Sequence, residues 1–322
     1  MFGLIMVSVD GSDFSERAID YAVALADRAN AEVHLTLVHE PMPTWAADPT
    51  AGPIEDQARQ GEQAYLDSLI AKTGDETSVT VTGDIVGAPG ATAFEEHAVK
   101  RGFSDRLLNR PVAAALALHA EERRADIVVM STHGRGAIRR LWLGSVAEQL
   151  VWQVHIPVLL IKPEHEDGKL WSREFNHILL PLDTSAESEA VIDTAIDLGK
   201  LFGTRFTILQ VQGEPFAYGG IPPQLSAEAV ATLVDDQVAS VRTYLDGIVA
   251  RFADAGLEAE ALTVASESPT GGILQVAEDR DVDLIALSTH GGGVKSLLMG
   301  SVTARVVQRA EVPILVVTPA RG

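Results

Sequence analysis

Short apolar runs alternate with longer amphipathic stretches along the whole chain. Leu4–Val9 is an almost unbroken apolar run, which is typical of a strand covered on both faces. The stretch after it places Ala18, Ala22 and Leu25 on one helical face. This alternation of strands and helices predicts parallel strands joined by right-handed crossovers.

The pattern occurs twice, and each copy is predicted to hold five strands. In the first copy the predicted strands are Leu4–Val9, Glu32–Val38, Ser78–Thr82, Asp126–Met130 and Val158–Ile161. In the second copy they are Ile178–Leu182, Arg205–Val211, Glu260–Val264, Leu284–Leu287 and Ile314–Val317. The later helices of the first copy are predicted at Glu55–Ala71, Val112–Arg123 and Val146–Gln153.

An internal repeat supports this division. The sequence STHGRGAIRRLWLGSVAEQLV in the first copy matches STHGGGVKSLLMGSVTARVV in the second. We therefore predict two tandem domains, 1–165 and 172–322, joined by the polar stretch Glu164–Glu174. The predicted fold class is α/β, with a doubly wound five-stranded parallel sheet in each domain.

The two copies differ in length. Asp10 and Asp183 are 173 positions apart, whereas His133 and His290 are only 157 apart. The first copy therefore carries a net 16 extra residues, which we place at about 83–108. A compact α/β unit does not need this insertion, which is either a neutral surface segment or a partner-binding elaboration.

Composition narrows the classes of function. The chain has 25 basic and 45 acidic residues and a net charge of −20, which argues against a nucleic-acid partner. It has no cysteine, which excludes disulfides and thiolate zinc sites. The first apolar run is too short to span a membrane and lacks the features of a signal peptide. We expect a cytoplasmic protein with no membrane association.

An aspartate follows the first strand of each copy, in the contexts VSVDGS and LPLDTS. Ligands of such sheets bind beyond the carboxyl ends of the strands, where Asp10 and Asp183 are placed. Their carboxylates can accept a hydrogen bond from a base or a ribose, or help to hold Mg²⁺. The alternative role is a cap on the helix or turn that follows.

The loop after the fourth strand carries the strongest signal. In both copies a glycine follows the strand and a Gly-Ser pair opens the next helix: Gly134 and Gly144-Ser145, then Gly291 and Gly300-Ser301. Glycines let backbone N–H groups approach phosphate oxygens, and a helix N-terminus favours an anion. We expect Ser145 and Ser301 to act as N-caps and to donate hydroxyls to a phosphate.

This combination resembles the universal stress protein family, over essentially the whole chain and in two copies. The resemblance implies an adenine nucleotide alpha hydrolase-like fold with strand order 3-2-1-4-5. It implies ATP as the ligand, with or without Mg²⁺, and a role in stress survival. It also implies that the last strands pair across a dimer interface, which the two repeats can satisfy as an internal pseudo-dimer. Whether two such chains then associate as a homodimer is left open.

The resemblance also assigns binding residues, by position in each copy. In the first copy they are Asp10, Val38, Met130, Ser131, Gly134, Gly144, Ser145 and Val146. In the second copy they are Asp183, Val211, Leu287, Ser288, Gly291, Gly300, Ser301 and Val302. Two features depart from the family pattern: serine replaces the first glycine in both copies, and the second loop is one residue shorter.

Three functions fit these features. The first is an ATP-binding regulatory protein, the second a slow ATPase, and the third a scaffold or small-ligand carrier with degenerate loops. No nucleophile elbow, Walker lysine loop or HExxH helix is present, so we expect weak ATP hydrolysis at most. His133 and His290 lack metal-ligand spacing, so no metal-ligating residue is predicted.

Overall fold

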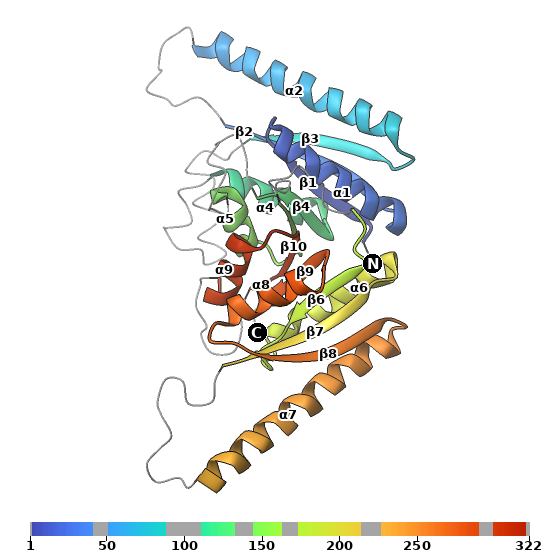
Figure 1. The fold of residues 1–322 in the computed structure, drawn as a ribbon. Helices are drawn as coiled ribbons and strands as arrows, with labels where there is room; N and C mark the ends of the chain where they lie inside the picture. Colours follow the sequence, from blue (N-terminus) through green and yellow to red (C-terminus); the bar gives the residue numbers. More distant parts are fainter. Residues whose placement is uncertain are drawn as a thin grey trace. The chain divides into compact units, whose positions relative to one another are not determined.

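The computed structural model describes residues 2–40, 51–87, 111–132, 144–162, 173–213, 227–289 and 299–319. The chain divides into two compact units, Met1–Gly168 and Lys169–Gly322. Figure 1 shows both units as α/β folds, and the two tandem domains predicted from the repeat are present. Among the described helices, none combines the length and the apolar character needed to cross a bilayer.

Unit 1 contains five parallel strands and, within the described ranges, four helices. The strands are β1 (Leu4–Val9), β2 (Glu32–His39), β3 (Val81–Gly87), β4 (Ile127–Ser131) and β5 (Val158–Ile161). The helices are α1 (Asp13–Ala29), α2 (Ala51–Glu76), α4 (Pro111–Arg123) and α5 (Ser145–Gln153). The strand order is β3-β2-β1-β4-β5, which confirms the predicted order.

Both faces of this sheet are covered by helices, as expected for a doubly wound fold. A Cβ atom added at Gly83 of β3 would lie 3.2 Å from Leu66 and 3.0 Å from Ile70, so this face meets α2. The neighbouring residues Thr82 and Asp84 point to the other face, where α4 lies. Covering both faces explains why β1 and β4 are apolar almost throughout.

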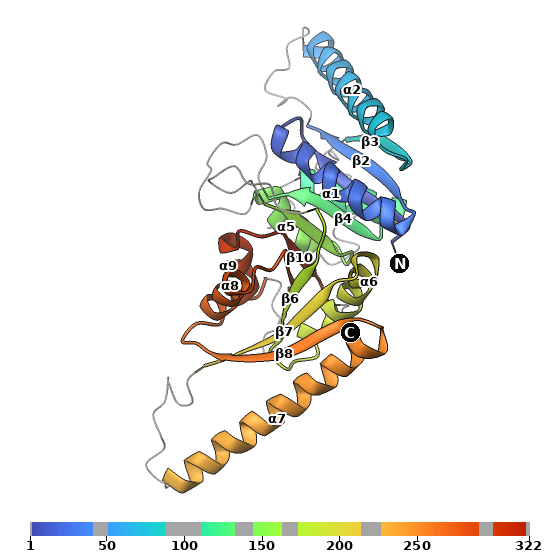
Figure 2. The same cartoon turned by 45° about the vertical axis from the view of Figure 1, so that its right-hand side comes forward.

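Unit 2 repeats the architecture. Its strands are β6 (His177–Pro181), β7 (Arg205–Gln212), β8 (Glu258–Ala265), β9 (Leu284–Ser288) and β10 (Ile314–Val317), in the order β8-β7-β6-β9-β10. The helical elements are η2 (Ser188–Val191), α6 (Ile192–Phe202), α7 (Ala227–Asp254), α8 (Pro269–Asp279) and α9 (Ser301–Arg309). Figure 2 shows α6 and α7 beside β7 and β8, with α8 and α9 on the opposite face of the sheet.

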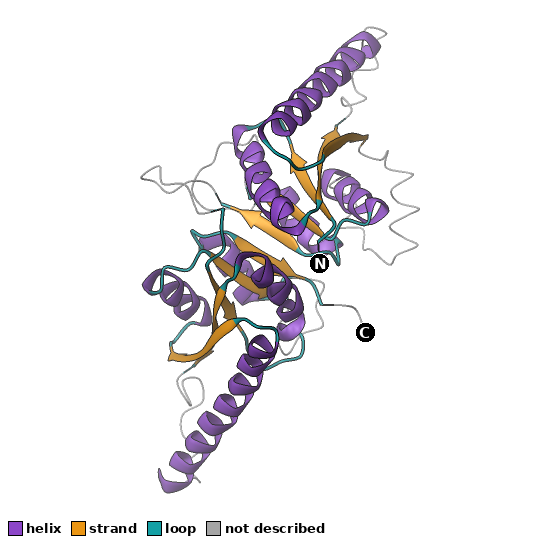
Figure 3. Cartoon of the chain, turned by 90° about the vertical axis from the view of Figure 1, so that its right-hand side faces the viewer, coloured by secondary structure: helices purple, strands orange, loops and turns teal. Residues whose placement is uncertain are grey.

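Close packing fixes these helices on the sheet of unit 2. The rings of Phe206 on β7 and Phe252 on α7 have centroids 4.6 Å apart, and both side chains are fully buried. Gly199 of α6 approaches the Phe206 ring so closely that a Cβ atom there would lie 2.6 Å from it. Figure 3 shows the strands of each unit flanked by helices.

Most predicted elements are found, and the third strand of unit 1 is the main error. It was predicted at Ser78–Thr82 but spans Val81–Gly87. Residues 83–87 of the predicted insertion therefore belong to this strand, and positions 88–108 lie outside the described residues. The extra residues lie after the strand, because 23 residues separate Gly87 from Pro111, whereas three separate Ala265 from Pro269. This excess of 20 is larger than the net 16 chiefly because the stretch from Asp10 to Gly87 is five positions shorter than that from Asp183 to Ala265.

Candidate functional site

The candidate site of unit 1 lies where the strand order reverses between β1 and β4. Beyond the last register pair of β1 and β2, Val9 with Leu37, Asp10 lies beside Val38. On its other side, the register of β1 and β4 places Asp10 next to Thr132. The carboxyl ends of three neighbouring strands therefore bring together Asp10, Val38 and the residues at the end of β4, as predicted for such a sheet.

Asp10 is held in a compact turn. Its Oδ1 accepts hydrogen bonds from the Ser12 backbone N–H, at 3.0 Å, and from the Ser12 hydroxyl, at 2.6 Å. Its own N–H donates to Ser15 Oγ at 3.1 Å. Between Asp10 and Ser12, Gly11 has φ +80°, the left-handed conformation that glycine adopts most easily. The turn orients the half-buried carboxylate at the strand end.

Unit 2 repeats this turn with other residues. Oδ1 of Asp183 accepts from the N–H of Ser185 at 3.1 Å and from its hydroxyl at 2.5 Å. The Asp183 N–H faces Ser188 Oγ at 3.4 Å. Thr184 takes the place of the glycine and has φ +69°. A β-branched residue in this conformation is strained, and such strain persists only where the surrounding structure imposes it.

The helix that follows the glycine-rich loop begins beside the end of the fourth strand in both units. Gly144 N–H donates to the Thr132 carbonyl at 2.7 Å, and Gly300 N–H donates to the Thr289 carbonyl at 2.8 Å. These bonds place the amino ends of α5 and α9 at the same sheet edge as the aspartates. The free N–H groups of a first helical turn and the helix dipole favour an anion there.

The predicted N-caps are wrong by one residue. Gly144 and Gly300 occupy the N-cap positions, with ψ of 139° and 142°, and neither helix has a side-chain cap bond. Ser145 and Ser301 are the first helical residues and are exposed. The glycines are the caps because each has an extended backbone and its carbonyl accepts the first helical hydrogen bond, from Glu148 and Ala304 N–H at 2.9 Å. The serine hydroxyls are therefore not used as caps.

The other predicted binding residues differ in how far their side chains are exposed to solvent. Met130, Leu287 and Ser288 are buried, with exposed fractions of 4–6%, so they offer backbone groups rather than side chains. Val38, Val211, Ser131, Val146 and Val302 are half-buried. Gly134 and Gly291 lie outside the described residues.

A tyrosine from the long second helix of each unit also approaches the aspartate turn, which the sequence patterns did not predict. Tyr65 of α2 donates a hydrogen bond to Glu16 Oε1 at 3.0 Å, and burial, followed by this bond, raises its pKa. In unit 2, burial and then the charge of Glu189 raise the pKa of Tyr244. Both phenols therefore stay protonated. The repeated signal in the sequence is the glutamate six residues after each aspartate, at Glu16 and Glu189, whereas the tyrosines stand at different spacings in the two copies.

Unit 1 has one feature beside Val38 that unit 2 lacks. The fully buried His39 contacts two glutamates of α2, Glu62 at 2.7 Å from Nδ1 and Glu55 at 2.5 Å from Nε2. Burial alone lowers its pKa, but the hydrogen bonds to the two glutamates outweigh burial and raise the pKa overall. Gln212 stands at the equivalent position of unit 2. The ion pairs fasten α2 to the strand end that borders the candidate site.

Comparisons with known proteins agree with this architecture. A family model described as the universal stress protein family matches residues 1–162 and 174–318. A universal stress protein of Mycolicibacterium smegmatis is 27% identical over 322 residues, covering 98% of this chain and 97% of that protein.

Two solved structures are also similar. A universal stress protein from Archaeoglobus fulgidus matches with a TM-score of 0.63 at 17% identity, covering 98% of this chain and 96% of that chain. A universal stress protein in complex with cAMP covers 45% of this chain and 98% of its own, at 18% identity and a TM-score of 0.34.

Proposed function

The chain belongs to the universal stress protein family, and we propose that it binds an adenine nucleotide, with ATP as the ligand. The proposed sites lie at the carboxyl ends of β1 and β4 in unit 1 and of β6 and β9 in unit 2. Binding in these clefts makes the protein a regulator whose contacts with its partners change with nucleotide occupancy. The family implies that this regulation serves stress survival.

The observation that carries the proposal is the aspartate turn. Both units hold an aspartate, a left-handed residue and a serine in the same hydrogen-bonded arrangement. Unit 2 keeps it although Thr184 costs about 1–3 kcal/mol in that conformation. A turn needed only to start a helix would not require this strain, because many unstrained turns do the same. Retained strain beside a sheet edge supports a binding role for Asp10 and Asp183.

The surrounding groups divide the ligand between them. The carboxylates of Asp10 and Asp183 accept hydrogen bonds from donors of the base or the ribose. The first N–H groups of α5 and α9, with Ser145 and Ser301, bind the phosphates. Val38 and Val211 provide apolar contact beside the aspartates. Gly134 and Gly291 remain proposed contacts on the strength of the sequence motif alone.

The groups near the aspartates favour regulation by bound nucleotide over ATP hydrolysis. In the described part of the site, the phenols of Tyr65 and Tyr244 are held protonated, so neither can remove a proton from water. Asp10 and Asp183 already use one oxygen for the turn. We therefore propose binding without efficient turnover.

The proposal is tested by identifying what the protein carries and what stabilises it. The purified chain is denatured, and the released small molecules are identified by mass spectrometry. The ligand-free protein is then melted with ATP, with ATP and Mg²⁺, and with GTP as a control. We expect adenine nucleotide in the released fraction or a higher melting temperature with ATP. Neither result, in protein that is folded by circular dichroism, would refute the proposed function.

A further inference from the structure

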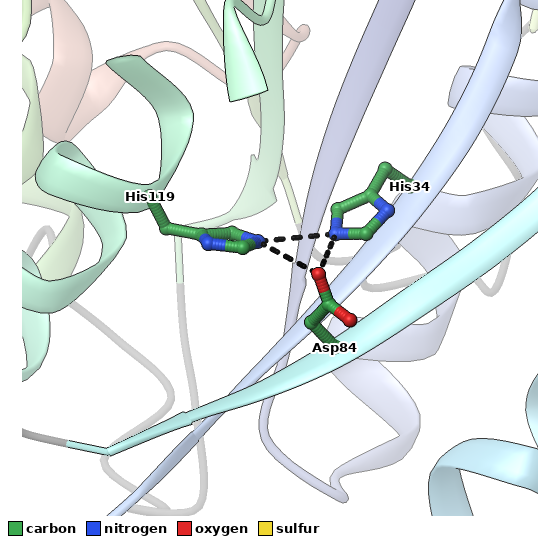
Figure 4. Close-up of side chains that lie close together, drawn as sticks. All are labelled: His34, Asp84 and His119. Carbon is green, nitrogen blue, oxygen red and sulfur yellow. Dashed lines mark hydrogen bonds and ion pairs between the residues drawn. The ribbon is translucent and has the colours of Figure 1, made fainter. Parts of the chain in front are cut away.

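Three side chains of unit 1 converge on one point of the sheet face covered by α4 (Figure 4). They are His34 of β2, Asp84 of β3 and His119 of α4. The Nε2 atoms of the two histidines lie 3.1 Å apart. Asp84 Oδ2 lies 3.4 Å from His34 Nε2 and 3.6 Å from His119 Nε2. Each of the three atoms is therefore close to both of the others.

The fold creates this meeting from residues far apart in sequence. The register of β2 and β3 pairs His34 with Thr82, so Asp84 lies two residues farther along β3 on the same face. His119 lies near the end of α4, the helix that packs on this face. Both histidines are buried, with exposed fractions of 1% and 8%, whereas the Asp84 side chain is 48% exposed.

Hydrogen bonds on the far side of His34 favour a proton on Nδ1. Thr82 donates its only hydroxyl hydrogen to Glu32 Oε1, at 2.5 Å, because a carboxylate can only accept. Thr82 Oγ1 then accepts the hydrogen of His34 Nδ1 at 2.8 Å, a shorter contact than that of the same nitrogen with Arg123 Nη2, at 3.3 Å, which would need a lone pair on Nδ1. Nε2 of His34 is left with a lone pair directed at His119 and Asp84. This threonine and carboxylate are the outer partners that a metal-binding histidine commonly has.

Without a metal the cluster holds one hydrogen between its three atoms. His119 Nε2 can donate it to the lone pair of His34 Nε2 at 3.1 Å, and the Asp84 carboxylate, 3.4 and 3.6 Å from the two nitrogens, then has no hydrogen donor of its own among the two rings. Neutral imidazole nitrogens and a carboxylate are common ligands of transition metals.

We propose that His34, Asp84 and His119 form a binding site for a divalent transition metal of the Zn²⁺ class, with a fourth position open to water. Donor atoms at zinc distances of about 2.0–2.2 Å lie about 3.3–3.6 Å apart in a tetrahedron, close to the three separations observed. Two imidazoles and a carboxylate suit Zn²⁺ better than Mg²⁺ or Ca²⁺, which prefer oxygen ligands. The exposed side of Asp84 provides the route of entry.

Charged groups around the site leave it receptive to a cation. Arg123 lies 3.9 Å from Asp84 Oδ2 and 3.8 Å from Glu32 Oε1, and its charge opposes metal binding. Asp84 and Glu32 together outweigh this single positive charge, and Glu122 adds a further negative charge near His119. The arginine holds both carboxylates in place and lowers the affinity without cancelling it.

This site is separate from the proposed nucleotide clefts. His34 is the third residue of β2, near its amino end, whereas Asp10 and Val38 lie at the carboxyl ends of the strands. A bound metal would join α4 to β2 and β3, and thereby fasten the helix to the edge of the sheet. The proposed metal site therefore does not depend on nucleotide binding.

Unit 2 cannot build the same site. The register places Thr207 and Leu262 at the positions of His34 and Asp84, and the matching ends of α4 and α8 place Val276 at the position of His119. Its buried His177 lies on β6 instead and contacts Thr207 Oγ1 at 2.9 Å. Within the described residues, the cluster in unit 1 is the one group of three or more His, Cys, Asp or Glu side chains close enough to hold a metal ion. The expected stoichiometry is therefore one metal ion per chain.

The test is a metal titration of the full-length, untagged chain after treatment with a chelator. Zn²⁺ binding is measured by calorimetry, and Co²⁺ is used as a coloured probe of tetrahedral coordination. His119→Gln and Asp84→Asn remove ligands, and His177→Gln is the matched control in unit 2. Asp84→Asn also guards against misfolding, because its side chain is half exposed. Thr82→Val removes the hydroxyl that links His34 Nδ1 to Glu32 and leaves the three ligands in place.

We expect one Zn²⁺ per chain and a tetrahedral Co²⁺ spectrum in the parent and in His177→Gln. Thr82→Val should weaken binding by roughly 10–100-fold, and loss of a direct ligand should weaken it further. The ATP response of the ligand variants should be unchanged. Absence of zinc binding in the parent, or equal affinity in the parent, His119→Gln and Asp84→Asn, would overturn the proposal.

Discussion

The two units share one fold but differ in which details they keep. The aspartate turn is present in both, although unit 1 places Gly11 at the left-handed position and unit 2 places Thr184 there. The histidine and aspartate cluster is present only in unit 1, since the equivalent positions of unit 2 cannot bind a metal. Unit 2 thus keeps the aspartate turn at an energetic cost, whereas the cluster of His34, Asp84 and His119 belongs to unit 1 alone.

Features common to both units have a different meaning from features found in one unit. Residues that only stabilise a parallel sheet can change freely between the copies, as Val33 and Phe206 do at the same register position. A strained turn that survives such change points to a shared task at the strand ends. The cluster of His34, Asp84 and His119 points to a task of unit 1 alone.

The largest expected effect comes from exchanging the left-handed residues. Gly11→Thr should destabilise unit 1 by about 1–3 kcal/mol, because a β-branched residue resists positive φ. Thr184→Gly should stabilise unit 2 by up to about 1 kcal/mol, after the larger entropy of the unfolded glycine is subtracted. Calorimetric melting of both variants measures the two shifts. If Gly11→Thr and Thr184→Gly changed the melting temperature in the same direction, the two turns would not be equivalent.

A smaller effect is expected from a hydrogen bond that only unit 2 has. The buried Thr303 hydroxyl of α9 donates to the Ser288 carbonyl at 2.8 Å, whereas unit 1 has Ala147 at this position. Thr303→Val should cost about 1 kcal/mol, the net worth of a neutral hydrogen bond. Denaturant unfolding measures the change, with Thr243→Val as the exposed control. Equal effects of both substitutions would contradict the role given to Thr303.

The smallest effect is a pH dependence specific to unit 1. The glutamates hold the folded pKa of His39 above its usual value, so its stabilisation is complete below about pH 6.5 and is lost as pH rises through the folded pKa. His39→Gln, which copies Gln212 of unit 2, should therefore lower the melting temperature most at about pH 6 and least at about pH 9. A loss that is constant across this range would contradict the account.

Sequence patterns predicted the interior of the fold better than its edges. Leu4–Val9, Val158–Ile161 and Ile314–Val317 are apolar runs buried on both faces, and their predicted bounds match the structure. β3 was misplaced because it is an edge strand without an apolar run. Its position is set by pairing with β2, which no local pattern shows.

For the candidate site, the places of some residues in the fold were predictable, while their binding role stays a prediction. The aspartates lie at strand ends and the Gly-Ser pairs at helix starts, as expected from the repeat. Tyr65 and the cluster of His34, Asp84 and His119 were missed, because strand register and helix packing bring these residues together from distant positions. The serine caps were misassigned because serine is a favoured N-cap, whereas the extended glycine before each serine occupies that position.

The central claim is that both aspartate turns bind adenine nucleotide. The most direct measurement is calorimetric titration of ATP into the parent chain, Asp10→Ala, Asp183→Ala and the double variant, with the exposed Asp13→Ala and Glu187→Ala as matched controls. We expect each single aspartate variant to lose one of two sites or to weaken it by about tenfold or more, which is roughly 1.4 kcal/mol or more. The controls should bind like the parent. Unchanged ATP affinity and stoichiometry in the double variant would contradict the claim.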